Sequence, residues 1–428
     1  MRKKIFIFED KDFSNFFPLT YNRPIYLLLC GIRTIREKLS FLYPNADKVF
    51  LCRNYLSEMV KENTLFPVNE FTLEAEDEVI FLNGRILPEK DFTGKVFFQK
   101  EPTLFLCDNK VAGIVCKGSF VLDNKSVFQN LHKSDEVFSL ENKIKVEKIQ
   151  VKMANYLWDL VNWNKDEIKS DFETFRPVLN FKKMFDQNEI DAQCVIYNLS
   201  DVWIGKNVKI DAFVVLDARE GPIYIDDEAK IQSHTRIEGP CYVGKKTLIT
   251  GGKIERNCSF GPNCRVGGEV EESIFLGYSN KYHEGFLGHS YIGEWVNLGA
   301  MTTNSDLKNN YGPVSVILNS QSINSGLIKV GCFIGDHSKT GIGTLLNTGT
   351  VIGFSSNVFG GGMPKEKYVS SFAWGDINGF QEYKLDKAIE IAGKVKERRE
   401  EKLTEAEKKV FSKIFEMTKE ERKENFSS

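Results

Sequence analysis

A six-residue period runs through the second half of the chain. From residue 328 to 359 the sequence reads IKVGCFIGDHSKTGIGTLLNTGTVIGFSSNVF, and an aliphatic residue or threonine recurs at every sixth position from Ile328 to Val358. This period is neither the two residues of a strand nor the 3.6 of a helix. It is typical of a parallel β-helix of hexapeptide repeats, in which short strands stack as triangular coils.

The same period recurs upstream and gives nineteen expected inward positions in all, nine of them followed directly by glycine. Average composition would supply roughly one or two such glycines. Glycine suits a corner where a side chain would clash. A β-sandwich is the alternative, but its turns do not hold a fixed register. The expected inward residues are Ile204, Ile210, Leu216, Ile225, Ile231, Ile237, Val243, Ile249, Ile254, Phe260, Val266, Ile292, Leu298, Ile328, Ile334, Thr340, Leu346, Ile352 and Val358.

Composition limits what the chain is expected to bind. Its 428 residues carry a formal net charge of −2 and a pI of about 6.3, which argues against nucleic-acid and membrane-surface partners. The nine cysteines occur singly, without a Cys-x-x-Cys pair, so neither a zinc ribbon nor a secreted disulfide scaffold is indicated. The first apolar stretch is too short for a signal peptide, and no membrane-spanning run occurs. The sequence therefore predicts a cytoplasmic protein.

Three regions are predicted along the chain. Residues 1–190 alternate apolar strands with helices, which predicts a Rossmann-like α/β domain. Residues 191–377 are expected to form the β-helix, interrupted at 267–291 and 302–327, and residues 378–428 a helical extension that caps it. Thr404-x-x-Glu407 predicts a capping box within that extension. In the first region we expect strands at 5–8, 46–52, 78–82 and 96–99, a hairpin around 108–110, a helix at 25–42, and helical pieces at 157–161 and 166–172.

His283 is the candidate for catalysis. It stands in the first interruption, and an imidazole titrates near neutrality, so it can take a proton from an attacking amine. The chain has five histidines, and four of them fall in the predicted β-helix. The alternative interpretation is a histidine that only makes hydrogen bonds on the outside of a coil.

The segment 275–306, FLGYSNKYHEGFLGHSYIGEWVNLGAMTTNSD, resembles the acetyltransferase half of the bifunctional glucosamine-1-phosphate acetyltransferase/N-acetylglucosamine-1-phosphate uridyltransferase. The whole chain is more similar to a GlmU-like group of sugar nucleotidyltransferases. The family motif SKAGHLxYLGDAxIGxxVNIGAG aligns with SNKYHEGFLGHSYIGEWVNLGAM without a further gap. The resemblance implies a left-handed β-helix, a homotrimer, acyl transfer from acetyl-CoA to an amino sugar, and cell-envelope biosynthesis. Trp295, Phe333 and Phe354 lie near expected coil corners, where we predict the subunit contacts.

The same alignment implies roles for individual residues. His283 matches the catalytic base and Asn297 a sugar-contacting asparagine. Phe286 replaces a phosphate-binding tyrosine, and Glu272 stands near the expected position of a lysine, so the acceptor is expected to differ from glucosamine 1-phosphate. The small-molecule partner remains a sugar phosphate or nucleotide sugar. Acyl-CoA is expected to contact Asn304, Ser305, Asp336 and Phe354.

The amino-terminal region departs from the nucleotidyltransferase pattern. The family's LAGGxGTRM loop, whose backbone amides hold phosphates, is replaced by FEDKDFSNFFPLTYNRP. Its metal-binding Gly-Asp is replaced by Asn83-Gly84-Arg85, which weakens the case for Mg²⁺ as cofactor. Two alternatives remain open: nucleotide binding through Arg23, Asn83 and Arg85, or a degenerate platform. No other metal site is predicted.

Two other functions also remain open. Hexapeptide carbonic anhydrases hold zinc between subunits on three histidines, for which His234, His283, His289 and His337 are candidates. The spacing His283-x5-His289 is not the pattern expected of that family. In the third interpretation the β-helix only trimerises a sugar nucleotidyltransferase. Metal analysis would distinguish a carbonic anhydrase-type zinc enzyme from an acyltransferase. Coenzyme A binding would distinguish an acyltransferase from a β-helix that only trimerises the chain.

Overall fold

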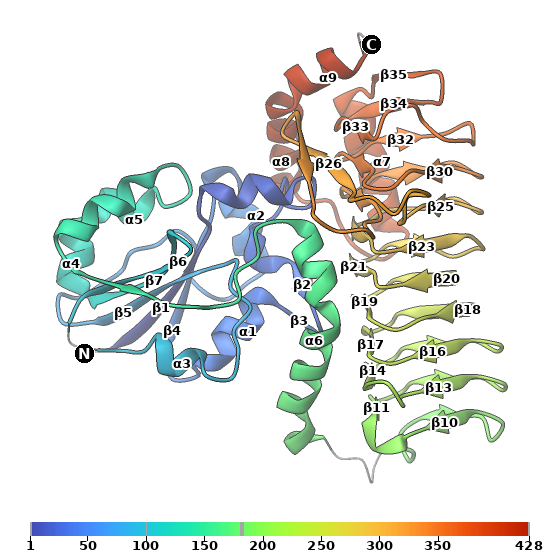
Figure 1. Cartoon of the computed structure of the whole chain (residues 1–428), viewed down its shortest axis with the longest axis horizontal. Helices are drawn as coiled ribbons and strands as arrows, with labels where there is room; N and C mark the ends of the chain where they lie inside the picture. Colours follow the sequence, from blue (N-terminus) through green and yellow to red (C-terminus); the bar gives the residue numbers. More distant parts are fainter. Residues whose placement is uncertain (1, 100, 180–183, 427–428) are drawn as a thin grey trace. The chain divides into compact units, whose positions relative to one another are not determined.

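The computed structural model describes residues 2–99, 101–179 and 184–426 and divides into two units (Figure 1). The first, here the α/β unit, contains the chain up to Phe16 with Asn22–Leu28 and Arg33–Tyr156. The second, here the solenoid unit, contains Leu157–Ser428 and two short upstream segments, Phe17–Tyr21 and Leu29–Ile32. The predicted order of an α/β domain, a parallel β-helix and a helical tail is confirmed, and the hand of the coil stays a prediction.

A six-stranded mixed sheet forms the α/β unit. Strand β1 pairs in parallel with β4 and β5, β7 is antiparallel to β5 and β6, and β8 runs parallel to β6. The predicted strands at 5–8, 46–52 and 78–82 and the hairpin are confirmed. The strand predicted at 96–99 is wrong, because β8 pairs with β6 and residues 96–99 follow helix α3 (Phe92–Lys95) without pairing to any described strand. In spatial order the strands are β4 (Asp47–Leu51), β1 (Lys3–Phe8), β5 (Glu78–Asn83), β7 (Lys110–Lys117), β6 (Thr103–Cys107) and β8 (Lys145–Lys148).

The helix predicted at 25–42 is wrong in its first half. Only α1 (Ile35–Leu42) is α-helical, and it begins at a capping box formed by Thr34 and Glu37. Before it lie a 3-10 turn and two short strands, β2 (Leu29–Cys30) and β3 (Arg33–Thr34). Gly31 has a φ of +85°, and a Cβ there would lie 2.6 Å from an oxygen of Asp171. The chain turns at this glycine, so the helix cannot run through it. The remaining short helices of the unit are α2 (Ser57–Glu62), α4 (Gly118–Asp123) and α5 (Lys125–Gln129).

The predicted helical pieces at 157–161 and 166–172 form one helix, α6 (Leu157–Phe175), which packs on the solenoid. Asn164 donates to the Asn257 carbonyl at 2.9 Å and accepts from the Ser259 hydroxyl at 3.0 Å. The rings of Trp158 and Phe333 lie 6.2 Å apart. By its contacts α6 belongs to the solenoid unit, which begins at Leu157, and the domain boundary expected near residue 190 stays a prediction.

Three ladders of parallel strands form the faces of the solenoid. Strands β18 (Leu248–Ile254) and β20 (Arg265–Glu271) each bend from the first face into the second. The first face also contains β9 (Glu189–Ile190), β12 (Lys209–Ile210), β15 (Lys230–Ile231), β22 (Asn280–Lys281), β29 (Lys339–Thr340), β32 (Asn357–Val358) and β34 (Ala373–Asp376). The second contains β10 (Val195–Tyr197), β13 (Val215–Asp217), β16 (Arg236–Glu238), β23 (Phe286–Gly288), β25 (Thr303–Asn304) and β30 (Leu345–Leu346). The third contains β11 (Val202–Ile204), β14 (Ile223–Ile225), β17 (Cys241–Val243), β19 (Cys258–Phe260), β21 (Ile274–Gly277), β24 (Tyr291–Glu294), β28 (Phe333–Ile334), β31 (Val351–Ile352) and β33 (Tyr368–Val369).

The hexapeptide pattern identifies the core of this solenoid. Of the nineteen expected inward residues, all except Ile328 are buried. Ile328 is 53% exposed because it follows a hairpin, β26 (Ser315–Leu318) and β27 (Gln321–Asn324), that leaves the coil. The predicted interruption at 302–327 is therefore a loop. The one at 267–291 is not, because β20 keeps pairing with β22 and β23 while the corners change length.

The carboxyl-terminal helices cover a side of the solenoid. They are α7 (Leu385–Glu397), α8 (Glu405–Met417) and α9 (Lys419–Phe426), preceded by a hairpin of β34 and β35 (Gly379–Glu382), and the predicted capping box of Thr404 and Glu407 is confirmed. The Phe411 ring of α8 lies 4.7 Å from Phe354 and 5.0 Å from His337. Trp295, Phe333 and Phe354 are consequently buried within the chain rather than free for subunit contacts. No helix among the described residues is both long and apolar enough to span a bilayer.

We predict that Phe411→Ala destabilises the solenoid unit. Its ring is 3% exposed and fills the space between α8 and the coils. Loss of a buried phenylalanine typically lowers the free energy of unfolding by about 3–5 kcal/mol. On the same helix, Met417 is 39% exposed, so Met417→Ala should cost roughly 1 kcal/mol or less. Denaturant unfolding followed by tryptophan fluorescence measures both, and equal losses would contradict this packing.

Candidate functional site

Each corner of the triangular coil carries a different set of side chains, and we name the corners by one residue each. The His283 corner joins the first face to the second, the His289 corner joins the second to the third, and the Phe354 corner joins the third to the first. The His283 corner carries Phe213, His234, Met301 and Ile342 on other coils; the His289 corner carries Glu271, Glu272, Asp306 and Lys329; the Phe354 corner carries Tyr278, Trp295, His337 and Phe372.

His283 presents an open imidazole. The residue is exposed, and within the described residues its ring makes no hydrogen bond and lies 5.1 Å from Tyr282. Its backbone carbonyl accepts a hydrogen bond of 2.9 Å from the ammonium of Lys281. Lys281 is 1% exposed, and burial lowers its pKa to about 8. The main chain at His283 is therefore fixed while both ring nitrogens stay open to a ligand.

The other predicted sugar contacts lie on different parts of the coil. Asn297 is exposed on the first face and accepts a hydrogen bond of 3.2 Å from Asn280. Phe286 is half-buried on the second face, and Glu272 belongs to the His289 corner. Among the described residues, no hydrogen bond or ion pair joins His283 to any of these three residues.

The four residues predicted to contact acyl-CoA are hydrogen-bonded to other parts of the chain or buried within it. Both amide atoms of Asn304 bond the backbone of Gly288, at 2.8 and 3.0 Å, so this side chain joins neighbouring coils. The Ser305 hydroxyl donates to the Leu307 carbonyl at 3.1 Å. Asp336 and Phe354 are fully buried, and α8 covers the Phe354 corner.

The candidate zinc ligands are also dispersed. His234 stacks on Phe213 at 5.6 Å along the His283 corner, and His337 is buried at the Phe354 corner. His289 occupies the third corner. Within one chain these histidines do not form the three-histidine set of a carbonic anhydrase-type site.

A charged cluster that the sequence analysis missed surrounds His289. Its Nδ1 lies 2.8 Å from Asp306 Oδ2 and 3.7 Å from Glu271 Oε1, while its Nε2 lies 3.5 Å from Glu272 Oε2. Lys329 Nζ lies 3.3 Å from the same Glu271 oxygen. Asp306 follows His289 by 17 residues, and Glu272 precedes it by the same interval. That interval is one coil of the solenoid at this level, and it is the signal that could have linked these residues.

Charges in this cluster shift one another's titration. Burial raises the pKa of Glu271, although Lys329 and His289 oppose the shift. Burial also favours a higher pKa for Asp306, but hydrogen bonding and charge from His289 outweigh it and the pKa is lowered. A cavity of about 350 Å³ opens beside the cluster. It is lined by Lys165, Lys169, Glu220, Pro240, Glu255, Arg256, Asn257, Glu271, Glu272 and Lys329.

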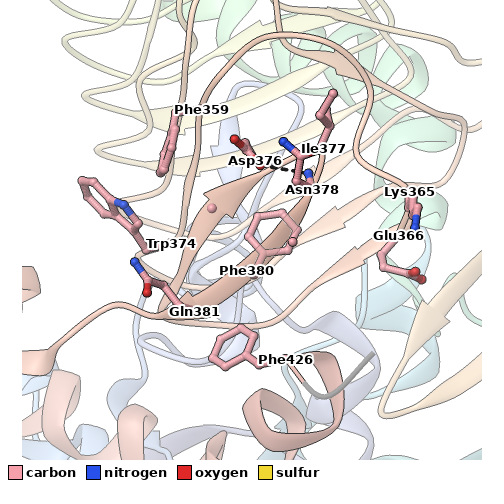
Figure 2. A pocket seen from close by; sticks show the side chains of 12 residues that line it. Phe359, Lys365, Glu366, Trp374, Asp376, Ile377, Asn378, Phe380, Gln381 and Phe426 are labelled. Carbon is pink, nitrogen blue, oxygen red and sulfur yellow. Dashed lines mark hydrogen bonds between the residues drawn. The ribbon is translucent and has the colours of Figure 1, made fainter.

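A second cavity, of about 500 Å³, lies at the last coils of the solenoid (Figure 2). Phe359, Trp374, Phe380 and Phe426 give it aromatic walls, and the Asp376 carboxylate accepts a hydrogen bond of 2.8 Å from the Asn378 backbone. None of its lining residues belongs to the predicted site. Its aromatic walls suit a flat, partly apolar ligand.

In the α/β unit, Asn83 and Arg85 converge on one carboxylate. Arg85 is fully buried and donates to Asp10 Oδ2 at 2.5 and 3.1 Å, and Asn83 donates to the same oxygen at 2.8 Å. Arg85 also lies 3.2 Å from Asp12, whose other cation is Lys110 at 2.6 Å. Burial favours a higher pKa for Asp12, but these cations outweigh it and the pKa is lowered. Both carboxylates already have cationic partners, so the residues at this strand edge do not fit Mg²⁺.

Arg23 lies apart from that group. Its carbonyl accepts from Arg53 at 2.8 Å, and Arg53 forms a buried ion pair with Glu9 at 3.1 Å. The three predicted nucleotide-binding residues therefore divide into a pair at Asp10 and a third residue beside the Glu9–Arg53 pair. A cavity of about 390 Å³ opens at the Asp10 side, lined among others by Asp12, Asp108 and Lys110.

Several known proteins are similar to parts of this chain. The family described as "Sugar nucleotidyl transferase" matches residues 5–177. A "Bifunctional sugar-1-phosphate nucleotidylyltransferase/acetyltransferase" of Sulfurisphaera tokodaii is 34% identical over 156 residues, which is 33% of this chain and 36% of that protein. "Bifunctional protein GlmU" of Methanococcus aeolicus is 25% identical over 389 residues, covering 79% of this chain and 89% of that protein. Among solved structures, a UDP-N-acetylglucosamine acyltransferase from Campylobacter jejuni matches 52% of this chain and 95% of its own, with 13% identity and a TM-score of 0.30.

An α/β unit of sugar nucleotidyl transferase type joined to a hexapeptide solenoid defines the class of this protein. Within that class, the chain is similar in sequence to bifunctional proteins of GlmU type. The matched segments span 36%, 47% and 40% of the length of the first three relatives, those of Sulfurisphaera tokodaii, Wigglesworthia glossinidia brevipalpis and Nitrosospira multiformis.

The strand edge of the α/β unit makes a kinetic prediction. With Arg85 bound to Asp10 and Asp12, Mg²⁺-dependent nucleotidyl transfer should be slow or absent. Pyrophosphate release from sugar 1-phosphates with each nucleoside triphosphate, with and without Mg²⁺, measures this. Binding of nucleotide sugars, followed separately by calorimetry, need not be lost. Rapid pyrophosphate release that depends on Mg²⁺ would overturn this prediction.

Proposed function

We propose that the chain is a transferase acting on sugar phosphates or nucleotide sugars. Its solenoid unit transfers an acyl group from acyl-CoA, with acetyl-CoA as the first candidate, to an amine of the sugar. Its α/β unit binds the nucleotide sugar and has little nucleotidyl transfer of its own. The observation that carries this proposal is the open imidazole of His283 in the segment that aligns with the acetyltransferase motif. The bifunctional names of the relatives support it.

The main catalytic group that this acyl transfer requires from the protein is a general base positioned beside the amine. The amine nitrogen attacks the thioester carbonyl, a C–N bond forms, and the C–S bond breaks to release coenzyme A. An imidazole facing the amine accepts its proton, and the leaving thiolate takes up a proton afterwards. Backbone amides of the corner can stabilise the oxyanion, so part of the rate should survive without the base.

The His283 corner also suits a subunit contact, and we include a cytoplasmic homotrimer in the proposal. Three apolar side chains on other coils of this corner are exposed: Phe213 at 55%, Met301 at 55% and Ile342 at 75%. Burying such side chains against a second copy is favourable. Residues of a neighbouring copy would then complete the acyl-CoA site, which one chain does not gather.

The trimer is testable on the full chain. Light scattering at micromolar concentration should give three times 48.9 kDa. Ile342→Asp places a charge in the proposed contact and should shift the mass toward the monomer. Asp386→Asn, an exposed change on α7, is the control that should leave the mass unchanged. A wild-type monomer would refute the assembly.

His283→Ala tests the chemistry. The variant should lower acyl transfer by roughly 10²–10⁴-fold, the usual contribution of a positioned base, with acyl-CoA affinity little changed. Coenzyme A release is followed with a thiol reagent, using amino sugar 1-phosphates and nucleotide-linked amino sugars as acceptors. His234→Ala is the matched control, because it removes another imidazole from the same corner. Full activity in His283→Ala, or no acyl-CoA binding by the wild type, would contradict the proposal.

The second candidate function is a solenoid that serves only as a scaffold for the α/β unit. The engagement of Asn304 and the burial of Asp336 and Phe354 favour it. Under this alternative the chain still binds nucleotide sugars but binds no acyl-CoA. Calorimetric titration with acetyl-CoA and with coenzyme A therefore distinguishes the two.

A further inference from the structure

At the His289 corner, three carboxylates surround one imidazole. Glu271, Glu272 and Asp306 each place an oxygen within 3.7 Å of a ring nitrogen of His289. Among the described residues, Lys329 is the one other cation with an ion pair in this cluster. Lys165, Lys169 and Arg256 also line the cavity beside this cluster. The corner therefore brings one imidazole and three carboxylates together.

Three atoms of the corner are arranged as metal ligands. Successive coils supply Glu271, His289 and Asp306, whose ligand atoms all lie within 4.8 Å of one another. Metal bonds to nitrogen and carboxylate oxygen are about 2.0–2.2 Å long, so small side-chain rotations would bring all three atoms onto one ion. One imidazole with two carboxylates suits first-row ions such as Mn²⁺ and Zn²⁺ better than Ca²⁺.

The far side of the imidazole gives an independent indication. Nε2 of His289 lies 3.5 Å from Glu272, which is not a member of the ligand set. Glu272 is itself held by a hydrogen bond of 3.1 Å from Asn257. A carboxylate behind the outer nitrogen of a histidine is the arrangement that orients metal-binding imidazoles.

Lys329 lies beside the two carboxylates of the proposed ligand set. Its ammonium lies 3.3 Å from Glu271 and 3.9 Å from Asp306, beside the two oxygens that would bind an ion. The side chain is 42% exposed and can move into solvent when an ion enters. The neighbouring 350 Å³ cavity, lined by Glu271, Glu272 and Lys329, provides a path from solvent and room for water ligands.

We propose that Glu271, His289 and Asp306 bind one divalent first-row transition-metal ion, with Glu272 as the positioning residue for the imidazole. The site lies at a different corner from His283, so it does not rest on acyl transfer. The sequence analysis named His289 only as a candidate for a three-histidine zinc site, and it missed Glu271 and Asp306 because the three ligands come from three coils.

Metal binding by the full chain tests this directly. After chelator treatment, equilibrium dialysis against Mn²⁺ with elemental analysis should find one ion per chain, and Mn²⁺ should raise the thermal midpoint. Mn²⁺ is the probe because thiolates of the nine cysteines prefer softer ions. His289→Ala and Asp306→Asn should abolish both effects. Glu272→Gln, which keeps the ligand set, should weaken binding by roughly 10- to 100-fold.

Two matched variants complete the experiment. His234→Ala removes a solenoid histidine outside the cluster and should leave stoichiometry and affinity unchanged. Lys329→Met removes the competing ammonium and should bind Mn²⁺ at least as tightly as the wild type. Absence of stoichiometric binding at millimolar Mn²⁺ in both wild type and Lys329→Met would overturn the proposal. So would unchanged binding in His289→Ala and Asp306→Asn, with folding of each variant verified by circular dichroism.

Discussion

Hydrogen bonding between successive coils is the constraint on which the solenoid unit depends. Each short strand pairs in parallel with the strands one coil before and after it, so side chains at matching positions stack in columns. Inward columns form the continuous aliphatic core. At the corners the same stacking collects whatever the sequence places there: exposed apolar residues near His283, aromatic residues near Phe354, and charged residues near His289. Each corner of the solenoid unit is therefore lined along its length by its own kind of side chain.

The columns differ in what covers them. Helix α8 packs on the Phe354 corner and α6 packs on the third face, where the Tyr291 hydroxyl also donates to the Leu29 carbonyl at 2.7 Å. The His283 corner keeps its apolar side chains exposed. Coverage by the chain's own helices thus differs from corner to corner, and among the three it is the His283 corner that keeps several large apolar side chains exposed.

The sequence predicts those features that follow from local periodicity. It identifies eighteen of nineteen inward residues, the strands at 5–8 and 78–82, and the capping box at Thr404, because each depends on near neighbours in the chain. It misses the late start of the helix predicted at 25–42, because the turn at Gly31 depends on contact with the distant Asp171. It also misses the pairing of His289 with Asp306, since that depends on the length of one coil rather than on any motif. Packing of α8 on Phe354 likewise has no local signature.

Arg85 has a consequence for how this strand edge responds to metal ions in solution. The Arg85 guanidinium is part of the chain and remains protonated at any physiological pH. The positive charge beside Asp10 and Asp12 therefore does not depend on the supply of metal ions and is insensitive to chelators. Replacing Arg85 by a neutral residue would remove this cationic partner from Asp10 and Asp12 without adding a third metal ligand. This strand edge therefore keeps the same charge balance whether or not divalent cations are present.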